Sequence, residues 1–373
     1  MKKVLFVATV DQHIRHFHIP YIKWFKGQGH HVSVASRGNE CVSDVDTKYE
    51  VSFERTPWSL NNFFAFRNLL RILKENKFDL IHTHTPVASI LVRVANLLMK
   101  NRAKVIYTAH GFHFYKGAKL LNWFLYFPVE KLLSYCTDSI ITINNEDYEF
   151  SLKNFGCKNI YLVDGVGVDL NKFTPASFGE RNSFREKLNL SVSDFVLIYV
   201  GELSKRKNQK LLLDSISKLN EKLDGFKLLL VGKGNEEEYL KERCSLLGIQ
   251  DKVMFLGYRN DIDNLMKLSD LSVSTALQEG LPVNVMESLS TGLPCIVTNC
   301  RGNRDIISNM YNGIVVEHFD SELISDAIYQ LFNDQVLLEK MKKNALVSSR
   351  KYSEDTIMKT MIDIYSKYIG HDK

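Results

Sequence analysis

The sequence predicts an α/β protein of two doubly wound units, each a parallel sheet with helices on both faces. Short β-branched runs recur in the first half, for example KVLFVAT and FDLIHTH, and again in the second, for example FVLIYVG and FKLLLVG. Amphipathic segments such as NQKLLLDSISKLNEKL separate these runs. Continuous apolar strands that alternate with helices are typical of parallel sheets buried on both faces. A length of 373 residues also exceeds what one hydrophobic core usually supports, which favours two domains.

The boundary between the two units is expected in a polar segment rich in turn residues. Residues 165–183, GVGVDLNKFTPASFGERNS, separate the two series of strands. We predict a first domain over residues 1–168, a second over residues 169–352 and a cleft between them, with a final helix over about residues 353–373 packed on the first domain. Ligands of such sheets bind beyond the carboxyl ends of the strands, so the residues that follow each strand are the candidates for function.

Composition excludes several classes of protein. The six cysteines form no C-x-x-C pair and no Cys/His cluster at metal spacing, so we expect a reducing cytoplasm, with neither a disulfide scaffold nor a zinc site. The apolar run at the start is brief and is interpreted as a buried strand. No apolar stretch approaches the roughly 20 residues that cross a bilayer, so any membrane contact is expected to be peripheral. The net charge of +5 is mild, and no nucleic-acid partner is expected.

The segment LQEGLPVNVMES, residues 277–288, carries the clearest functional signal. Pro282 fits the first position of a helix that follows the strand DLSVST and ends near Thr291. The N–H groups of Val283, Asn284 and Val285 would then point at a ligand with the positive end of the helix dipole. This arrangement binds anions such as a diphosphate.

Two carboxylates eight residues apart flank this helix start. Glu287, about one turn inside the helix, is placed to accept hydrogen bonds from a ribose diol. Glu279, ahead of the helix, is placed to accept them from hydroxyls of a sugar beyond the phosphates. A nucleotide diphosphate-sugar satisfies both acids. The alternative is that Glu279 is a solvated loop acid and Glu287 an exposed helical residue.

These residues resemble a known signature. Glu279-Gly280-Leu281-Pro282 with Glu287 resembles the E-x7-E signature of retaining family 4 glycosyltransferases of the GT-B fold. The segments VGELSKRKNQ, VGKGNEEEYL, VMFLGYRNDI and STGLPCIVTN follow in the order of that family's donor domain. In the first half, IHTHTP, YTAHGFHF, TINNEDY and GVGVDLNKF resemble the branch that serves bacterial capsular and exopolysaccharide assembly. The resemblance covers nearly the whole chain.

The resemblance implies a GT-B fold of two Rossmann-like domains and a metal-independent hexosyl- or N-acetylhexosaminyl-transferase. The second domain would bind a nucleotide diphosphate-sugar, expected to be a UDP-sugar, and the first would present a hydroxyl of a lipid-linked saccharide. Because no carboxylate is placed by the sequence as an obvious nucleophile, the resemblance implies that the acceptor attacks on the face that the leaving phosphate occupies, and that this phosphate accepts the proton. No cofactor is expected besides the donor, which is a co-substrate, and no metal, because the helix end and basic residues supply the positive charge.

In that family a basic pair after the phosphate-loop glycine holds the diphosphate. Lys207 matches the lysine of this pair, but Glu202 stands where many members have the arginine. Lys205 or Arg206 must then supply the second charge, and we favour Arg206 because a guanidinium binds phosphate oxygens bidentately. The alternative for this basic run is a solvated turn. The predicted donor-binding residues are Arg206, Lys207, Tyr258, Arg259, Gly280, Leu281, Val283, Asn284, Val285 and Glu287.

Nine of the eleven histidines lie before residue 114. His110, in YTAHGFHF, follows a strand end and matches the family's histidine near the reacting carbon of the sugar. Its predicted role is donation to a sugar hydroxyl or to the leaving phosphate, and with Glu279 it forms the predicted catalytic pair. His84, in HTHTP, and His16 or His18, in HIRHFHIP, are candidates for the acceptor side, and a structural role is the alternative for each.

Other short motifs bear on alternative functions of this chain. The D-x-D segments at residues 44–46 and 261–263 resemble metal-diphosphate sites of the other major glycosyltransferase fold, but both are interpreted as structural. VGKGNEE lacks the third glycine of a dinucleotide fingerprint, which disfavours a dehydrogenase. Two rival functions stay open. One is a nucleotide-sugar epimerase of the same architecture, and the other is a non-catalytic protein that binds sugar nucleotides.

Two segments rich in aromatic and basic residues, WSLNNFFAFRNLLRILK and FYKGAKLLNWFLYFPVEKLL, are candidates for contact with a membrane. Their cations, including Arg67, Arg71, Lys116 and Lys119, would favour an anionic surface by roughly 1 kcal/mol each. The alternative is that both segments are packed helices of the first domain. We therefore expect a cytoplasmic protein with peripheral contact to the inner face of the cell membrane.

Overall fold

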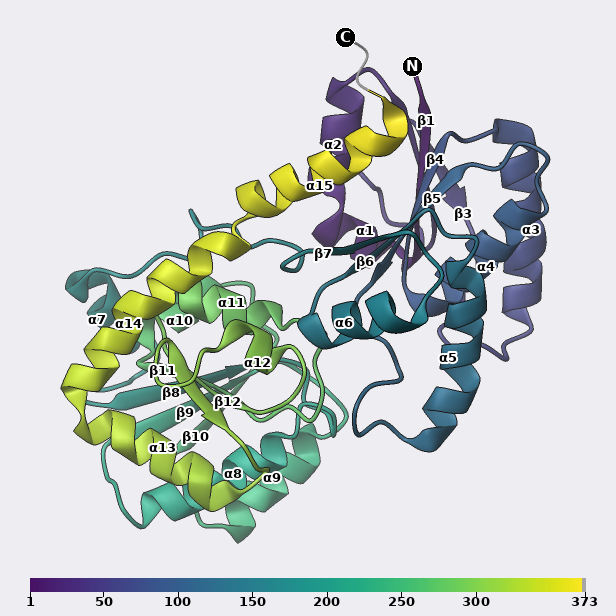
Figure 1. The fold of residues 1–373 in the computed structure, drawn as a ribbon. Coiled ribbons are helices and arrows are strands. Elements are labelled where there is room, and N and C mark those ends of the chain that lie inside the picture. Colours follow the sequence, from purple (N-terminus) through teal and green to yellow (C-terminus); the bar gives the residue numbers. More distant parts are fainter. Residues whose placement is uncertain (371–373) are drawn as a thin grey trace. The chain divides into compact units, whose positions relative to one another are not determined.

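The computed structural model describes residues 1–370, which form two compact units (Figure 1). The first unit contains Met1–Asp164 and the chain from Ile357 onward, and the second contains Gly165–Thr356. The sequence placed this boundary a few residues later, and residues 371–373 of the expected final helix lie outside the described residues. Each unit has one parallel sheet covered by helices, so the predicted pair of doubly wound α/β units is confirmed.

The first unit has a seven-stranded sheet of order β3-β2-β1-β4-β5-β6-β7. Its strands are β1 (Lys3–Val10), β2 (His31–Arg37), β3 (Thr47–Glu50), β4 (Leu80–His84), β5 (Lys104–Ala109), β6 (Ser139–Thr142) and β7 (Asn159–Leu162). Its helices are α1 (Asp11–Phe17), α2 (Ile19–Gly27), α3 (Asn61–Asn76), α4 (Pro86–Leu97), α5 (Leu120–Ser134), α6 (Asn145–Asn154) and most of α15 (Glu354–Ile369).

Alternating side chains of β1 enter two hydrophobic cores, one on each face of the first sheet. Phe6 belongs to the core that includes Phe25 of α2 and Tyr365 of α15. Leu5 belongs to the core on the other face, which includes Leu69 of α3. Successive side chains of a strand point to opposite faces, so a continuous apolar run can supply both layers. The apolar run at the start of the chain is therefore a buried strand inside the sheet, and the predicted buried strand is confirmed.

His82 of β4 is a buried polar residue whose two ring nitrogens are both bonded. Its Nδ1 lies 2.7 Å from the hydroxyl of Tyr365, and its Nε2 lies 2.8 Å from Oγ1 of Thr108. Tyr365 lies on α15, far along the chain, so this contact links the final helix to the first sheet. Because buried polar groups are costly when left unbonded, the contact also specifies how α15 packs.

Replacement of Tyr365 by phenylalanine is expected to lower the free energy of unfolding of the first unit by about 1–3 kcal/mol, since it leaves Nδ1 of His82 buried without a partner. All three tryptophans belong to the first unit, so urea unfolding followed by tryptophan fluorescence reports that unit alone. Tyr329→Phe, on the surface of the second unit, is the matched control. Equal unfolding midpoints for Tyr365→Phe and the wild type would contradict this prediction.

The second unit has a six-stranded sheet of order β10-β9-β8-β11-β12-β13. Its strands are β8 (Phe195–Val200), β9 (Phe226–Val231), β10 (Val253–Gly257), β11 (Leu271–Ser274), β12 (Cys295–Thr298) and β13 (Gly313–Val316). Its helices are α7 (Phe178–Glu186), α8 (Gln209–Asn220), α9 (Glu237–Leu246), α10 (Ile262–Leu268), α11 (Val283–Ser290), α12 (Asn303–Ile306), α13 (Ser321–Asn333) and α14 (Gln335–Ser349), followed by the 3-10 turn Arg350–Tyr352.

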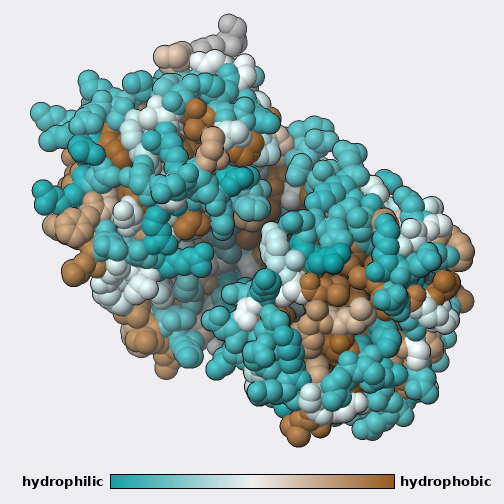
Figure 2. Space-filling model, turned by 180° about the vertical axis from the view of Figure 1, so that it is seen from behind, coloured by the Kyte–Doolittle hydropathy of each residue, from teal (hydrophilic) through white to brown (hydrophobic). Residues whose placement is uncertain are grey.

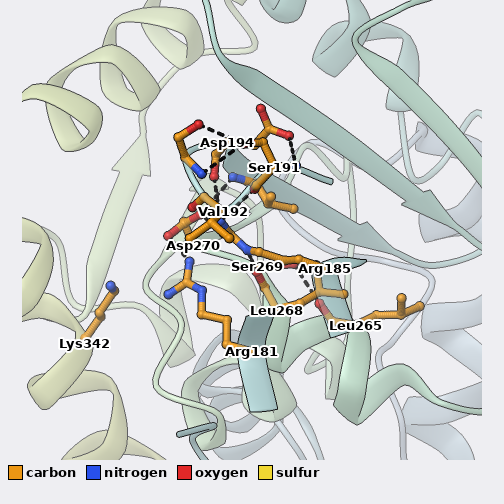
Figure 3. A network of polar contacts seen from close by, with 12 residues as sticks. Arg181, Arg185, Ser191, Val192, Asp194, Leu265, Leu268, Ser269, Asp270 and Lys342 are labelled. Carbon is orange, nitrogen blue, oxygen red and sulfur yellow. Dashed lines mark hydrogen bonds and ion pairs between the residues drawn. The ribbon is translucent and has the colours of Figure 1, made fainter. Parts of the chain in front are cut away.

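A buried ionic network holds α7 to the second sheet (Figure 3). Asp270, just before β11, accepts from Nη2 of Arg185 at 2.7 Å and from the N–H of Val196 at 2.8 Å, and it also pairs with Arg181. Arg185 donates in addition to the carbonyl of Leu268 at 3.0 Å. A buried charge is tolerated only when it is paired and fully bonded, and these contacts meet that condition. The network therefore fixes the starts of β8 and β11 relative to α7.

Strand order directs attention to one pair of strands in each sheet. In the first sheet β1 lies between β2 and β4, and in the second β8 lies between β9 and β11. In each sheet the strands that follow β1 or β8 in the chain are added first on one side of it and then on the other, so the strand order reverses there. Ligands of doubly wound sheets bind outside the carboxyl ends of the strands at such a switch point. The loops that follow β1 and β4, and those that follow β8 and β11, are therefore the places to search for a site.

Candidate functional site

Two loops of the second unit are bonded together at the carboxyl ends of β8 and β11. The N–H of Leu277 donates to the carbonyl of Arg206 at 2.9 Å. The hydroxyl of Thr275 donates to the carbonyl of Asn208, also at 2.9 Å. Residues 201–208 and 275–282 consequently form one platform at the switch point of the sheet.

Helix α11 begins on this platform. Pro282 is its N-cap, with φ −74° and ψ 115°, so helical geometry starts at Val283. Pro282 was predicted one residue too far inside the helix, because its fixed φ suits either position and only ψ separates them. The first turn leaves the N–H groups of Val283 and Asn284 without partners inside the helix, but the prediction of a third free N–H at Val285 is wrong, because that group donates to the carbonyl of Pro282 at 3.2 Å. The side-chain amide of Asn284 donates to the carbonyl of Val200 at 2.9 Å, which holds the helix start against the end of β8.

Glu279 is buried and bound by two cations. Its Oε2 lies 3.1 Å from Nη1 of Arg206, and its Oε1 lies 2.6 Å from Nζ of Lys207. Only 7% of the residue is exposed, so it is not a solvated loop acid. Lys205 instead lines a separate cavity of about 470 Å³ beside α8 and α9. Arg206 and Lys207, and not Lys205, thus contact Glu279. Glu279 lies about one turn before the start of α11.

The loop that carries Glu279 is supported from β12 by two residues that the sequence analysis did not single out. Nε of the buried Arg301 donates to the carbonyl of Glu279 at 3.2 Å. At Gly302, whose φ is +83°, a Cβ would lie 2.6 Å from the carbonyl oxygen of Gly280. Any side chain there would displace the loop. Both residues follow a strand end, so the rule that directed attention to His110 could also have identified them.

Glu287 is half-buried inside α11. Burial raises the pKa of its carboxyl to about 7, Lys172 opposes this rise and Asp263 adds to it. No hydrogen bond to this carboxylate is found within the described residues. An acid that is half-protonated near neutrality and has no bonded partner is a candidate for function, because a ligand that donates to it would stabilise its charged form.

Tyr258 and Arg259 lie two strands away from this platform, just after the carboxyl end of β10. They follow β10, which β9 separates from β8. Tyr258 is exposed, and Arg259 forms a bidentate pair with Asp261 at 2.8 and 2.6 Å. In residues 1–370 no hydrogen bond or ion pair connects either residue to Glu279. Asp261 pairs with Arg259 and is the N-cap residue of α10. These contacts agree with the structural role predicted for the D-x-D segment at residues 261–263.

The first unit carries a cluster of histidines at the carboxyl ends of β1, β4 and β5. We call it the histidine cluster, and its members are His13, His18, His82, His84 and His110. The rings of His18 and His84 are stacked with centroids 3.8 Å apart. The centroid of His110 lies 4.9 Å from that of His13 and 5.6 Å from that of His84. Of the predicted histidines, His18, His84 and His110 belong to the cluster, whereas His16 is exposed on α1 and contacts its own helix through the carbonyl of Gln12.

The histidine cluster is neutral near pH 7. Burial lowers the pKa of His110 to about 4 and that of His82 to about 3, with the charge of His110 adding to the effect at His82. The pKa values of His13, His18 and His84 also lie well below the usual value, chiefly because of burial and then because of neighbouring histidines. A neutral imidazole keeps one N–H donor and one acceptor nitrogen. His110 can therefore donate a hydrogen bond without carrying a charge.

A cavity of about 250 Å³ opens beside this cluster at the ends of β1 and β4. Its lining includes Thr9, His13, Arg55 and Thr85. The hydroxyls of Thr9 and Thr85 lie 2.7 Å apart across the two strand ends. The cavity thus combines hydroxyl, imidazole and guanidinium groups at the switch point of the first sheet, which suits a polar ligand.

Comparison with known proteins decides the family. The sequence model described as Glycosyltransferase Family 4 matches residues 21–171, and the one described as Glycosyl transferases group 1 matches residues 180–347. This chain belongs to the family 4 glycosyltransferases. The glycosyltransferase is 39% identical over 374 aligned residues to the Bacillus subtilis protein that carries the name glycosyltransferase EpsD, which covers 100% of this chain and 98% of that protein.

Two other known proteins are similar to this chain, one in sequence and one in fold. The glycosyltransferase is 32% identical to an Escherichia coli enzyme named UDP-Gal:alpha-D-GlcNAc-diphosphoundecaprenol alpha-1,3-galactosyltransferase, over 75% of this chain and 74% of that one. Anabaena HepE, solved in complex with UDP and glucose, superposes with a TM-score of 0.81 at 18% identity over 98% of this chain and 100% of that one. At this identity the likeness shows the fold, and the GT-B class predicted from the sequence is confirmed.

Proposed function

We propose that this glycosyltransferase moves a sugar, with retention of configuration, from a UDP-sugar to a hydroxyl of a lipid-linked saccharide. The observation that carries the proposal is the arrangement of Arg206 and Lys207 on Glu279, one turn before the start of α11. Two cations and a helix N-terminus suit a diphosphate, and a buried carboxylate beside them suits sugar hydroxyls. The E. coli relative is named for a UDP-sugar donor and a diphosphoundecaprenol-linked acceptor, which supports both substrate classes.

The donor would exchange partners with Glu279 when it binds. In the structure Glu279 neutralises part of the charge of Arg206 and Lys207 and keeps both side chains in place. The incoming diphosphate would bind the two cations and the N–H groups of Val283 and Asn284, while the carboxylate of Glu279 turns to the sugar hydroxyls. Because these groups already supply positive charge to the departing phosphate, the proposed reaction requires no metal ion and no cofactor.

The proposed transfer step involves no enzyme nucleophile. The oxygen of the acceptor hydroxyl bonds to the anomeric carbon on the face from which the phosphate departs, the bond between that carbon and the phosphate oxygen breaks, and the proton passes to the phosphate. Neutral His110 donates its N–H to a sugar hydroxyl or to the phosphate as negative charge develops. The acceptor saccharide would occupy the first unit, where the cavity lined by Thr9, Arg55 and Thr85 offers polar groups.

The lipid part of such an acceptor requires contact with a membrane, which we propose is peripheral. Among residues 1–370, no helix combines the length and the apolar character that a membrane span needs. Helix α5 exposes Leu120, Phe124 and Leu132, with exposed fractions of 72–75%. Figure 2 shows hydrophobic side chains on the surface of the first unit, along the edge on which α5 lies in Figure 1. Lys119, beside this apolar face, would attract anionic lipids of the cytoplasmic leaflet.

The resemblance of the first half to capsular and exopolysaccharide enzymes leads us to propose that the product serves assembly of such a polymer. The proposal is tested first by thermal shift with UDP-, GDP- and ADP-sugars. A donor present at 100 times its dissociation constant is expected to stabilise the protein by about 2.7 kcal/mol. Transfer to synthetic polyprenyl diphosphate saccharides, followed by mass spectrometry, then identifies the acceptor.

The rival functions give different results in the same assay. An epimerase would convert the donor sugar without any acceptor, and a non-catalytic binding protein would show the thermal shift with no turnover for any acceptor. Absence of a shift with every nucleotide-sugar would rule out the donor site that we propose. A product with inverted configuration at the anomeric carbon, seen by NMR, would rule out retention.

Donor affinity is expected to rise with pH because of Glu287. A ribose diol donates to the charged carboxylate, and the pKa of free Glu287 is about 7, so the form that binds the diol becomes dominant as the pH rises through 7. The diphosphate of a UDP-sugar is a diester and does not titrate in this range. Calorimetry between pH 6 and 8 should show tighter donor binding at the higher pH for the wild type. Glu287→Gln should bind more weakly and without this pH dependence.

A further inference from the structure

Three members of the histidine cluster have the arrangement of a metal site. One ring nitrogen each from His13, His84 and His110 lie within 4.8 Å of one another. Nε2 of His110 and Nδ1 of His84 are 3.4 Å apart. In a tetrahedral site with zinc–nitrogen bonds of about 2.1 Å, ligand nitrogens lie roughly 3.4 Å apart. Small ring rotations would therefore bring all three nitrogens to coordination distance.

We propose that His13, His84 and His110 bind one transition-metal ion of the zinc class, and that the bound ion blocks sugar transfer. The three residues come from α1, from the end of β4 and from the loop after β5, and the sheet topology brings them together. Their spacing along the chain matches no metal-binding motif, which is why the sequence analysis predicted no zinc site. The blocking effect rests on the proposed function of His110, whereas binding of the ion does not.

An unsatisfied nitrogen supports a ligand at this position. Nε2 of His13 is buried and has no hydrogen-bond partner within residues 1–370, and Nδ1 of His84 has only its 3.4 Å contact with Nε2 of His110. Buried polar groups normally have partners, so the unbonded nitrogen of His13 is available to a ligand. His82, in contrast, uses both nitrogens on Tyr365 and Thr108 and offers none to an ion.

The chemistry of the donors selects the kind of ion. Three imidazoles without a carboxylate among them suit Zn²⁺, Ni²⁺ or Cu²⁺, whereas Mg²⁺ and Ca²⁺ prefer oxygen ligands. The three rings are neutral near pH 7, which is the form that coordinates metals. Three protein ligands leave a fourth position for water, and the cavity that His13 lines gives an ion access to it.

A coordinated His110 would not perform its proposed role. Its nitrogen nearest His84 would be held by the ion, and the ring orientation would be set by the metal geometry instead of by the substrate. The ion would also add positive charge beside the cavity proposed for the acceptor. Zinc would accordingly act as an inhibitor, and a chelator would restore activity.

The test uses full-length protein without a histidine tag, dialysed against ZnCl₂ or CoCl₂. The wild type is expected to hold one ion per chain by elemental analysis, and Co²⁺ should give the visible absorption of a tetrahedral site. His13→Gln should bind at least about 100-fold more weakly, since changes in the groups around a metal site already cost about 10–100-fold. His16→Gln, an exposed histidine of the same helix, is the matched control and should bind as the wild type does.

Two outcomes would overturn the binding site, and a third would overturn the blocking effect. Equal binding by His13→Gln and the wild type would place the ion elsewhere, as would loss of binding in His16→Gln. If His13→Gln fails to fold, judged by its tryptophan fluorescence, His110→Gln takes its place in the binding measurement. The rate with zinc divided by the rate without zinc, measured for each variant, tests inhibition separately. A bound ion that leaves this ratio at one in the wild type would overturn the blocking effect while the binding site stands.

Discussion

Replacement of His110 by alanine is expected to lower turnover by a factor of order 100 or more and to leave the dissociation constant of the donor unchanged. A single hydrogen-bond donor aimed at negative charge that develops in the transition state raises the rate by about this factor. Burial keeps the imidazole neutral, with a pKa of about 4, so its N–H is available throughout the neutral pH range. Turnover would be measured with saturating donor and acceptor, and donor affinity by calorimetry.

Two control variants separate chemistry from packing in this experiment. His110→Gln keeps a side-chain N–H donor and should recover part of the lost rate, whereas a purely structural role would show no such recovery. His318→Ala removes an exposed histidine of the second unit and should behave as the wild type. Wild-type turnover in His110→Ala would remove this residue from the proposed mechanism.

Replacement of Lys207 by methionine is expected to weaken donor binding by about 30-fold or more. Loss of one partner from a desolvated ionic contact costs about 2–5 kcal/mol. Lys207 is largely buried and its ammonium lies 2.6 Å from Glu279, so it meets a diphosphate in a dry environment. Calorimetry with UDP and with the donor sugar measures the change, and the affinity of the wild type should fall as salt is added.

The neighbouring basic residues provide a graded comparison. Arg206→Met should show a smaller loss in the same direction, because Arg206 also contacts Glu279 but is more exposed. Lys205→Met should have almost no effect, since Lys205 lines a separate cavity. A loss for Lys205→Met as large as that for Lys207→Met would mean that the diphosphate binds on the other side of the loop and would refute the donor site.

Much of the fold could be predicted because its signals are local. The run KVLFVATV is buried from Val4 to Thr9, and its alternating side chains enter both cores of the first unit, so its apolar character alone marks it as a buried strand. Helix α11 was also predicted from neighbouring residues, with an error of one position at Pro282. Strand ends then directed attention to Glu279 and His110, because ligand sites in doubly wound sheets depend on where strands end.

The rest depends on residues that are distant in the sequence. The segment HIRHFHIP holds three histidines, but α1 has only seven residues, too few for a periodic pattern to show that His13 faces inward and His16 faces solvent. The partner of His82 is Tyr365, on the last helix of the chain. Likewise, the basic run of residues 205–207 does not reveal that Arg206 and Lys207 meet Glu279 while Lys205 turns away.

The sequence by itself determined the class of fold, the family and the segments that carry function, because hydrophobic periodicity and short motifs are properties of neighbouring residues. Only the tertiary structure decided which histidines gather, which basic residue accompanies Lys207 and why Glu287 titrates near pH 7. Those features arise from burial and from partners that the two sheets bring together. Desolvation and charge pairing act through space, so they are set when distant segments pack.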